Sequence, residues 1–386
     1  MSKAPSHTPR FSMADFSLKQ FLGGLSPDRF LAEYWQKKPL LIRQALPGFG
    51  RWLTPESLRQ LAGYEDAESR LVQFKRGRWH LRHGPFESSA LDALPARNWS
   101  LLVSGVNHFL TEGDELLNAF DFVPRARLDD LMVSLAPAGG GVGPHFDSYD
   151  VFLIQGLGRR RWEISDQPDL RLMEGVPLRI LENFQATQSW ELEPGDMLYL
   201  PPKYAHNGVA LDTCMTWSVG FRAPKREEVV SQFFAYMQDQ VQMPGIYSDP
   251  GLKRPRHAGE LPASMLEWAV EAIRECAWDD RTIEDFLGRY LSEPKAHVFF
   301  DPPEKALSRK AFAARILKKG LRLDPRSQLL FRSSRYYLNG ESVRVPKEMP
   351  HLGRQMADHR CLPAGHYPDN WLDTFYDWYR SGYLII

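Results

Sequence analysis

The chain has 386 residues, of which 43% are hydrophobic and 25% charged, so it is too long for one compact domain and too rich in apolar residues to be disordered. Its 48 basic and 48 acidic residues cancel, which excludes an overall electrostatic attraction to nucleic acid or to a membrane surface. The three cysteines lie far apart without CxxC spacing, which favours the cytoplasm, and the sequence shows neither a secretory signal at residues 1–11 nor the ~20 successive apolar residues that cross a bilayer.

The N-terminal part of the chain is expected to mix helices with strands. Helices are predicted to begin at Ser26 and at Thr54, because each is followed by a proline, which is favoured in the first helical turn. Short strands are predicted at residues 71–74 and 79–81. This part is therefore predicted to contain both helix and sheet.

The central part of the chain, residues 131–222, has the pattern of a sandwich or barrel. Its apolar segments are short, recur about every 8 to 12 residues and are separated by glycine and proline, without long helical periods between them. This pattern predicts a cupin-like jelly roll, so the fold is expected to be mainly β with added helices (α+β). The predicted strands are residues 131–135, 151–154, 160–164, 197–200 and 214–221.

The last part of the chain is expected to be mainly helical. Helical periodicity follows residue 224 and returns after a loop rich in proline and glycine at residues 247–262. A helix that begins near Ser308, a hairpin that turns at Asn339 and a final aromatic-faced helix predict a winged-helix-like domain. The chain is therefore divided into three predicted domains: residues 1–223, 224–304 and 305–386.

The C-terminal part is the basic part of the chain. Residues 306–386 contain 14 basic and 7 acidic residues, a net charge of +7. Winged helices often bind nucleic acid, but Lys318, Lys319 and Arg322 are explained as well by a solvated helix face. We favour the solvated face, and direct nucleic-acid binding is the second interpretation.

A candidate metal site begins at the glycine-rich residues 139–143. They lead into His145 and Asp147, which lie two residues apart and therefore point to the same face of a strand. His206, which follows a strand ended by two prolines, would complete a 2-His-1-carboxylate site for iron(II) and leave positions open for a chelating cosubstrate and oxygen. The alternative is that His145 and Asp147 form a structural hydrogen-bonded pair and that His206 caps a loop.

Arg160 is a second candidate site residue. Alternation places Arg160, Trp162 and Ile164 on one face of a strand, so this guanidinium lies on the apolar side. A buried guanidinium needs an anionic partner, and its fork fits one carboxylate of a dicarboxylate cosubstrate such as 2-oxoglutarate. The alternative partner is an internal Asp or Glu. Three strand hydroxyls could line the same cavity, although local hydrogen bonds would explain each of them alone: Ser134, Thr216 and Ser218.

Several segments resemble the JmjC-type 2-oxoglutarate oxygenases, and within them the bacterial ribosomal protein arginine hydroxylases. The main ones are DDLMVSLAPAGGGVGPHFDSYDVFLIQGLGRRRWEI, EPGDMLYLPPKYAHNG and WSVGFRAP. With FLAEYWQKKPLLI and HGPFESS they cover most of residues 30–224. The resemblance implies a double-stranded β-helix core, a helical dimerisation region after it and a C-terminal winged helix.

The resemblance also implies a function. His145, Asp147 and His206 would bind iron(II). Arg160 and Ser134 would bind 2-oxoglutarate, and oxygen would be consumed to place a hydroxyl on the β-carbon of an arginine in a protein of the large (50S) ribosomal subunit. A cytoplasmic homodimer is expected. The alternatives are a related oxygenase with another target (a histidyl hydroxylase, a lysine demethylase or an RNA-modifying enzyme) and a non-catalytic cupin-like binding protein.

Overall fold

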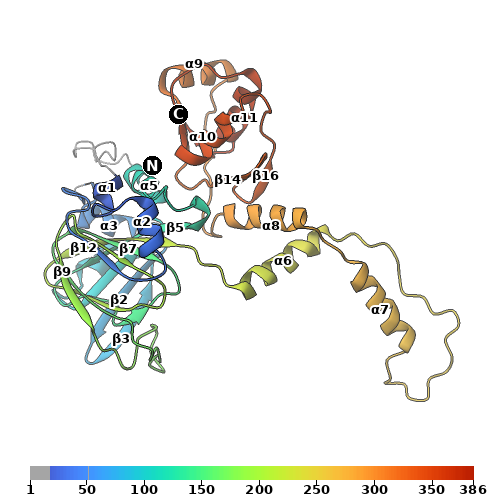
Figure 1. The fold of residues 1–386 in the computed structure, drawn as a ribbon, viewed down its shortest axis with the longest axis horizontal. Coiled ribbons are helices and arrows are strands. Elements are labelled where there is room, and N and C mark those ends of the chain that lie inside the picture. The colour runs from blue at the N-terminus through green and yellow to red at the C-terminus, as the bar shows by residue number, and fades with distance from the viewer. Residues whose placement is uncertain (1–17, 51) are drawn as a thin grey trace. The chain divides into compact units, whose positions relative to one another are not determined.

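The computed structural model describes residues 18–50 and 52–386, which form two compact units (Figure 1). Among the described residues, no helix is long and apolar enough to cross a membrane. Unit 1 holds the described chain up to Ala223 together with Pro294–Ser327 and Val345–Ile386. Unit 2 holds Pro224–Glu293 and Gln328–Arg344.

Unit 1 begins with short helices, two of which the sequence predicted. The starts of α2 (Pro27–Glu33) and α3 (Pro55–Leu61) are confirmed. The hydroxyls of Ser26 and Thr54 each accept a hydrogen bond from the backbone amide three residues further on, which satisfies a donor that the first turn leaves unpaired. The other helical segments of this part are α1 (Leu18–Phe21), α4 (Ser88–Asp92), α5 (Thr111–Asn118), η2 (Val106–His108) and η3 (Arg125–Arg127).

Two antiparallel sheets form the centre of unit 1, and they confirm the predicted cupin-like jelly roll. The larger sheet has the strand order β1-β10-β7-β12-β5-β4-β2-β3, and the smaller has the order β6-β11-β8-β9. The strands of the larger sheet are β1 (Leu40–Ile42), β2 (Ser69–Lys75), β3 (Arg78–His83), β4 (Trp99–Val103), β5 (Leu128–Ala136), β7 (Val151–Leu157), β10 (Met197–Leu200) and β12 (Cys214–Phe221). Those of the smaller sheet are β6 (His145–Phe146), β8 (Arg160–Ser165), β9 (Gln188–Leu192) and β11 (Ala205–Ala210).

All the strands predicted by range are confirmed, but the prediction missed β1, β4, β9 and β11. Strand β9 is largely polar and mostly exposed, so it has no apolar alternation. Strand β11 carries small residues because it lies against a large ring: a Cβ on Gly208 would come within 2.7 Å of the Trp162 indole. Both strands depend on tertiary packing that local composition does not encode.

Alternation along the strands divides the core of the jelly roll in two. On the outer face of the large sheet, Phe152 and Trp217 pack into a cluster with the N-terminal helices. On the inner face, Leu153 and Leu198 meet Trp162 of the small sheet. The space between the two sheets is therefore the place where inward-facing polar side chains come together.

The C-terminal part of unit 1 carries a three-stranded sheet and three helices. The predicted helix start at Ser308 is confirmed, since its hydroxyl accepts a hydrogen bond from the amide of Ala311, and Gly320 ends the helix with a φ of 73°. The aromatic-faced final helix is also confirmed, with Trp371 and Phe375 fully buried. The elements are α9 (Arg309–Lys319), α10 (His351–His359), α11 (Asp369–Arg380), β13 (Leu321–Leu323), β17 (Cys361–Leu362) and β18 (Leu384–Ile385).

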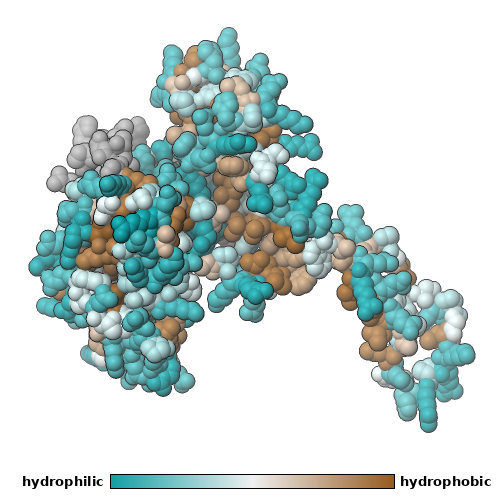
Figure 2. Space-filling view, viewed as in Figure 1, coloured by the Kyte–Doolittle hydropathy of each residue, from teal (hydrophilic) through white to brown (hydrophobic). Residues whose placement is uncertain are grey.

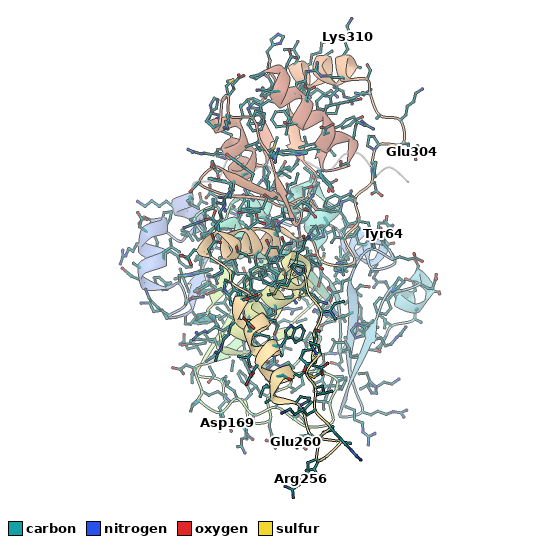
Figure 3. The ribbon with its side chains drawn as sticks, turned by 90° about the vertical axis from the view of Figure 1, so that its right-hand side faces the viewer. Tyr64, Asp169, Arg256, Glu260, Glu304 and Lys310 are labelled. Carbon is teal, nitrogen blue, oxygen red and sulfur yellow. The ribbon has the colours of Figure 1, made fainter. Side chains whose placement is uncertain are left out.

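Unit 2 has a small core, which Phe233, Met237 and Phe286 form. The predicted hairpin turn is confirmed, with Asn339 at φ 52° and a glycine after it at φ 87°. The elements are α6 (Arg226–Gln240), α7 (Ala263–Glu275), α8 (Asp280–Ser292), β14 (Leu329–Arg332), β15 (Arg335–Leu338) and β16 (Glu341–Val343). The predicted loop 247–262 contains no helix or strand, and Figure 3 shows Arg256 and Glu260 at its outer end.

Candidate metal centre

Strand pairing brings the two predicted histidine ligands together. In the antiparallel pair of β6 and β11, His206 lies directly opposite His145. Residues directly opposite in such a pair are the closest neighbours across the sheet, and the two imidazole ring centroids are only 4.2 Å apart. Because Asp147 follows His145 by two residues, its carboxylate reaches the same place.

The three side chains converge on one point. One ligand atom from each of His145, Asp147 and His206 lies within 4.8 Å of the others, and no further such group of His, Cys, Asp or Glu occurs in the described part of the chain. His206 Nε2 is 3.7 Å from Asp147 Oδ2. Three donors at these separations surround a space the size of a single metal ion.

Hydrogen bonds to the backbone orient both rings. His145 Nδ1 is 2.9 Å from the carbonyl oxygen of Gly143, and His206 Nδ1 is 2.9 Å from that of Tyr204. A carbonyl can only accept, so each Nδ1 carries a proton, and in a neutral ring Nε2 then keeps the lone pair that a metal binds. Hydrogen bonds of this kind commonly fix the ring orientation of metal-binding histidines.

Burial keeps His206 uncharged. The residue is 3% exposed, and burial together with the neighbouring His145 lowers the pKa of His206 to about 4, although Asp147 acts in the opposite direction. A neutral imidazole is the form that binds metals, so the ring is ready to do so at neutral pH. The alternative was a hydrogen-bonded pair of His145 and Asp147 with His206 as a loop cap, whereas His145 Nδ1 bonds to the Gly143 carbonyl and His206 lies within strand β11.

The glycine run before His145 is explained by close packing. Gly143 has a φ of 81°, and a Cβ on it would lie 2.6 Å from the side chain of Ile180 and 2.8 Å from the ring of Trp79. Any side chain here would push the strand away and displace the histidine two residues later.

Arg160 lies inside the jelly roll over the ring of Trp162, 5.7 Å from its centroid, and has no acidic partner among the described residues. The predicted face is confirmed, because Arg160, Trp162 and Ile164 are buried and pair with alternate residues of β11 that include His206. Arg160 is 4% exposed, and its Nε and Nη2 have no hydrogen-bond partner among the described residues. The alternative of an internal carboxylate partner is not observed there. A buried guanidinium of this kind requires an anion from outside the chain.

Ser134 faces the same interior. It pairs with Thr216 across β5 and β12. Two residues further along β5 lies Ala136, and two residues earlier on β12 lies Cys214. These two residues form a small buried cluster with Ala210. Ala210 is the residue directly opposite Arg160. Thr216 Oγ1 donates to a glutamine oxygen at 2.9 Å, whereas the Ser134 hydroxyl reaches only a carbonyl at 3.5 Å, too long for a strong bond. The Ser134 hydroxyl therefore lies on the inner face of the large sheet with one long hydrogen bond, to the Thr216 carbonyl.

Tyr149 is a site residue that the sequence reasoning missed. Its hydroxyl donates a hydrogen bond to Asp147, and burial, the charge of Asp147 and the charges of Asp130 and Asp129 raise its pKa above the usual range. Its spacing was the available signal, because Tyr149 follows Asp147 by two residues, just as Asp147 follows His145. Asp129 and Asp130 are themselves ion-paired with Lys295, at 3.2 Å each.

The fold and the donor set together define a cupin-type protein with a candidate mononuclear metal centre of the kind that non-haem oxygenases use. The JmjC domain family matches residues 115–229, and the ROXA-like winged helix family matches residues 275–385. The chain is 38% identical over 281 residues to the ribosomal protein uL16 3-hydroxylase of Escherichia coli K12, covering 72% of this chain and 74% of the relative. The chain therefore belongs to the JmjC-domain ribosomal oxygenases, and the sequence resemblance is confirmed.

Solved structures agree with this assignment. An X-ray structure of E. coli YcfD aligns with a TM-score of 0.81 and 33% identity over 94% of this chain and 98% of that chain. A structure of the same E. coli ribosomal oxygenase in complex with cobalt and 2-oxoglutarate aligns with a TM-score of 0.78 and 33% identity over the same shares. The jelly roll and the C-terminal winged helix thus follow the architecture of this family.

Proposed function

We propose that this protein is an iron(II)- and 2-oxoglutarate-dependent hydroxylase that modifies the β-carbon of an arginine in a 50S ribosomal protein. The convergence of His145, Asp147 and His206, with ligand atoms within 4.8 Å, is the observation that carries the proposal. The 3-hydroxylase name of the E. coli relative, which refers to uL16, supports the substrate class. The cobalt and 2-oxoglutarate complex of YcfD supports the cofactor and the cosubstrate.

The donor set fits iron(II). The Nε2 atoms of His145 and His206 and one oxygen of Asp147 would hold the ion on one face and leave the opposite positions for 2-oxoglutarate and oxygen. When bound, iron and 2-oxoglutarate activate O2, so that one oxygen atom enters a C–H bond as hydroxyl and the other appears in succinate, with loss of carbon dioxide. The chain's part is to hold the donors and keep each Nε2 unprotonated.

Arg160 would bind the far carboxylate of 2-oxoglutarate. Its unpaired Nε and Nη2 form the fork that fits a carboxylate in a bidentate manner. The Ser134 hydroxyl, on the facing sheet, would donate a further hydrogen bond. The ion pair would be buried among apolar side chains and hence weakly screened by salt, which would fix the cosubstrate in one orientation.

The proposed reaction can be tested with purified full-length protein, iron(II), 2-oxoglutarate and peptides from 50S ribosomal proteins. We expect one peptide to gain about 16 Da, the mass of one oxygen atom, on an arginine β-carbon. His206→Ala protein serves as the inactive control. Hydroxylation of another residue type would replace the substrate assignment by a related oxygenase activity. A protein that forms neither hydroxylated peptide nor succinate would contradict the enzyme assignment and favour the binding protein.

We further propose a cytoplasmic homodimer that uses helix α7. No residue of α7 is buried, even though the helix carries large apolar side chains. Leu266, Trp268 and Ile273 are 63%, 43% and 73% exposed. Figure 2 shows this apolar surface along the helix. Exposed apolar side chains in such a row are typical of a protein interface, and a second copy of the chain would cover them. We retain the three-domain division at residues 1–223, 224–304 and 305–386 as part of this proposal.

A further inference from the structure

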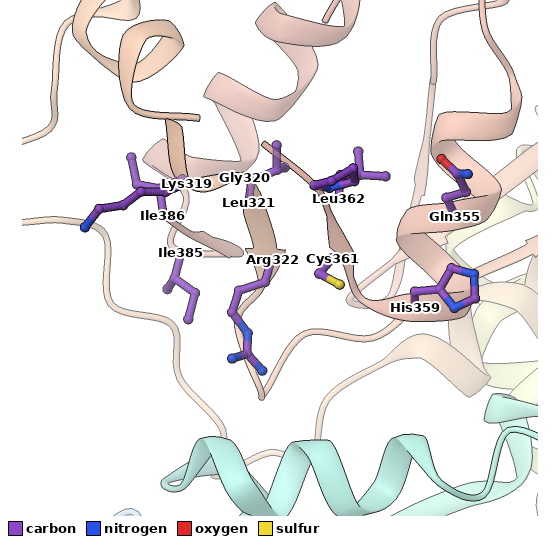
Figure 4. A pocket seen from close by; sticks show the side chains of 11 residues that line it. Lys319, Gly320, Leu321, Arg322, Gln355, His359, Cys361, Leu362, Ile385 and Ile386 are labelled. Atoms are coloured by element: carbon purple, nitrogen blue, oxygen red, sulfur yellow. The ribbon is translucent and has the colours of Figure 1, made fainter. Parts of the chain in front are cut away.

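The C-terminal part of unit 1 contains a pocket of about 650 Å³ that the proposed reaction does not use (Figure 4). It lies where the ends of α9 and α10 meet the β17-β13-β18 sheet, in the winged helix and outside the jelly roll. Its size is within the range of about 300–1,000 Å³ that is typical of small-molecule sites.

Strand register explains the wall of this pocket. On β13, Arg322 lies directly opposite Cys361 of β17 and Ile385 of β18, so these three side chains form a row on one face of the sheet. Leu321 and Leu362 alternate with them, so their buried side chains lie on the other face of the sheet. The row on this face is therefore a guanidinium between a thiol and an isoleucine, as Figure 4 shows.

The charge around the pocket is positive. Arg322 and Arg360 both form ion pairs with Asp114, so two cations share one buried carboxylate. Lys319 and His359 stand at the last turns of the two helices, and both line the pocket. None of the lining residues that the structure describes has an acidic side chain. Arg322, Arg360 and Lys319 therefore carry more positive charge than the single carboxylate of Asp114 neutralises.

We propose that this pocket binds a small amphipathic anion, with the apolar body of the ligand on the sheet and its acidic group between Arg322 and Lys319. Burying the apolar body against Ile385 supplies the affinity, since about 25 cal/mol is gained for each Å² removed from water. The two cations select an acid over a neutral molecule of the same shape. This inference is independent of the hydroxylase assignment, because it uses other residues.

Cys361 makes the pocket testable in the full-length chain. In a Cys276→Ser background, Cys361 is the exposed thiol and Cys214 is buried. Its reaction with the neutral disulfide 4,4′-dithiodipyridine forms a mixed disulfide and releases one thiopyridone, which absorbs light. We expect naphthalene-1-sulfonate to slow this reaction in a saturable manner, and 1-naphthalenemethanol, its neutral counterpart, to slow it much less. Absence of protection by the sulfonate, or equal protection by both compounds, overturns the proposal.

Two variants locate the effect, and each must keep the wild-type circular dichroism spectrum. Lys319→Glu is expected to weaken protection by about fivefold, the size of one exposed charge interaction. Lys318→Glu is the matched control, because this neighbouring lysine does not line the pocket. Ile385→Trp should remove protection by filling the space. Equal effects of the two lysine variants, or full protection of Ile385→Trp protein, would refute the assigned site.

Discussion

The jelly roll buries its large apolar side chains, whereas helix α7 exposes them. Trp217 of β12 is fully buried against Phe49 and Trp52, with its ring centroid 5.2 Å from that of Phe49. Trp268 of α7 is 43% exposed. The large sheet and the N-terminal segment exclude water from the Trp217 side chain within one chain, which gives the strands that carry the metal site a rigid support. Helix α7 completes its packing only if another surface covers it, which makes it a region for association.

The largest expected effect compares these two tryptophans directly. Trp217→Ala should lower the free energy of unfolding by about 3–5 kcal/mol, because it leaves a cavity in a closed core. Trp268→Ala should change the unfolding free energy of the monomer by less than about 0.5 kcal/mol. Urea unfolding at low protein concentration measures both. Similar losses in the two variants would show that α7 packs against its own chain.

Arg160 tests whether the buried interior of the jelly roll is arranged for an anion. Arg160→Met should raise the KM for 2-oxoglutarate by about 30-fold or more, since loss of one member of a buried charge pair costs at least about 2 kcal/mol. Metal affinity should be unchanged. Arg161→Met is the matched control, because Arg161 lies on the opposite face. Unchanged cosubstrate dependence in the Arg160 variant would remove this residue from the site.

Burial in unit 1 also disfavours the charged form of His108, which predicts that the stability of the protein depends on pH. Burial, Lys295 and His297 lower the pKa of His108 from 6.5 to about 4. Between these two values the unfolded chain binds a proton that the folded protein excludes, so stability is complete above pH 6.5 and is lost as the pH falls. From pH 7.5 to 5.0, His108 should account for a loss of up to about 2 kcal/mol.

The His108→Gln variant isolates this contribution. It cannot bind the proton in either state, so its stability should fall less than that of the wild-type protein over the same pH range. Urea unfolding at the two pH values measures the difference. An identical decrease in both proteins would indicate that His108 is protonated when folded.

The smallest expected effect concerns the exposed surface of α7. Ile273→Gln should weaken self-association by about tenfold, because it removes one apolar side chain from the proposed interface. Glu271→Gln, on the same helix, is the control and should dimerise as the wild-type protein does. Analytical ultracentrifugation over a concentration series measures both. A monomeric wild-type protein at every concentration would refute the dimer.

The parts of the site that were predictable follow from local geometry. The two-residue period of a strand fixes the common face of His145 and Asp147, and it also fixes the inward face of Arg160. The pairing of His206 with His145 was not predictable in the same way, because it joins strands about 60 residues apart through long-range register. Local signals therefore identified the candidate residues, and only the fold arranged them.

The misses have physical causes of the same kind. Tyr149 was missed because the carboxylates that raise its pKa include Asp129 and Asp130 of β5, about 20 residues earlier in the chain. Strand β11 was missed because its small residues are set by packing, with Gly208 against the Trp162 ring. Neither relation is visible in composition or periodicity.

The most direct test of the account is anaerobic binding of iron(II) and 2-oxoglutarate, followed by the visible absorption that arises when the cosubstrate chelates the metal. We predict one iron per chain and an absorption band in the wild-type protein, no band in His206→Ala, and a band in Arg160→Met that needs a much higher 2-oxoglutarate concentration. A full band in His206→Ala, at wild-type concentrations of metal and cosubstrate, would contradict the proposed centre.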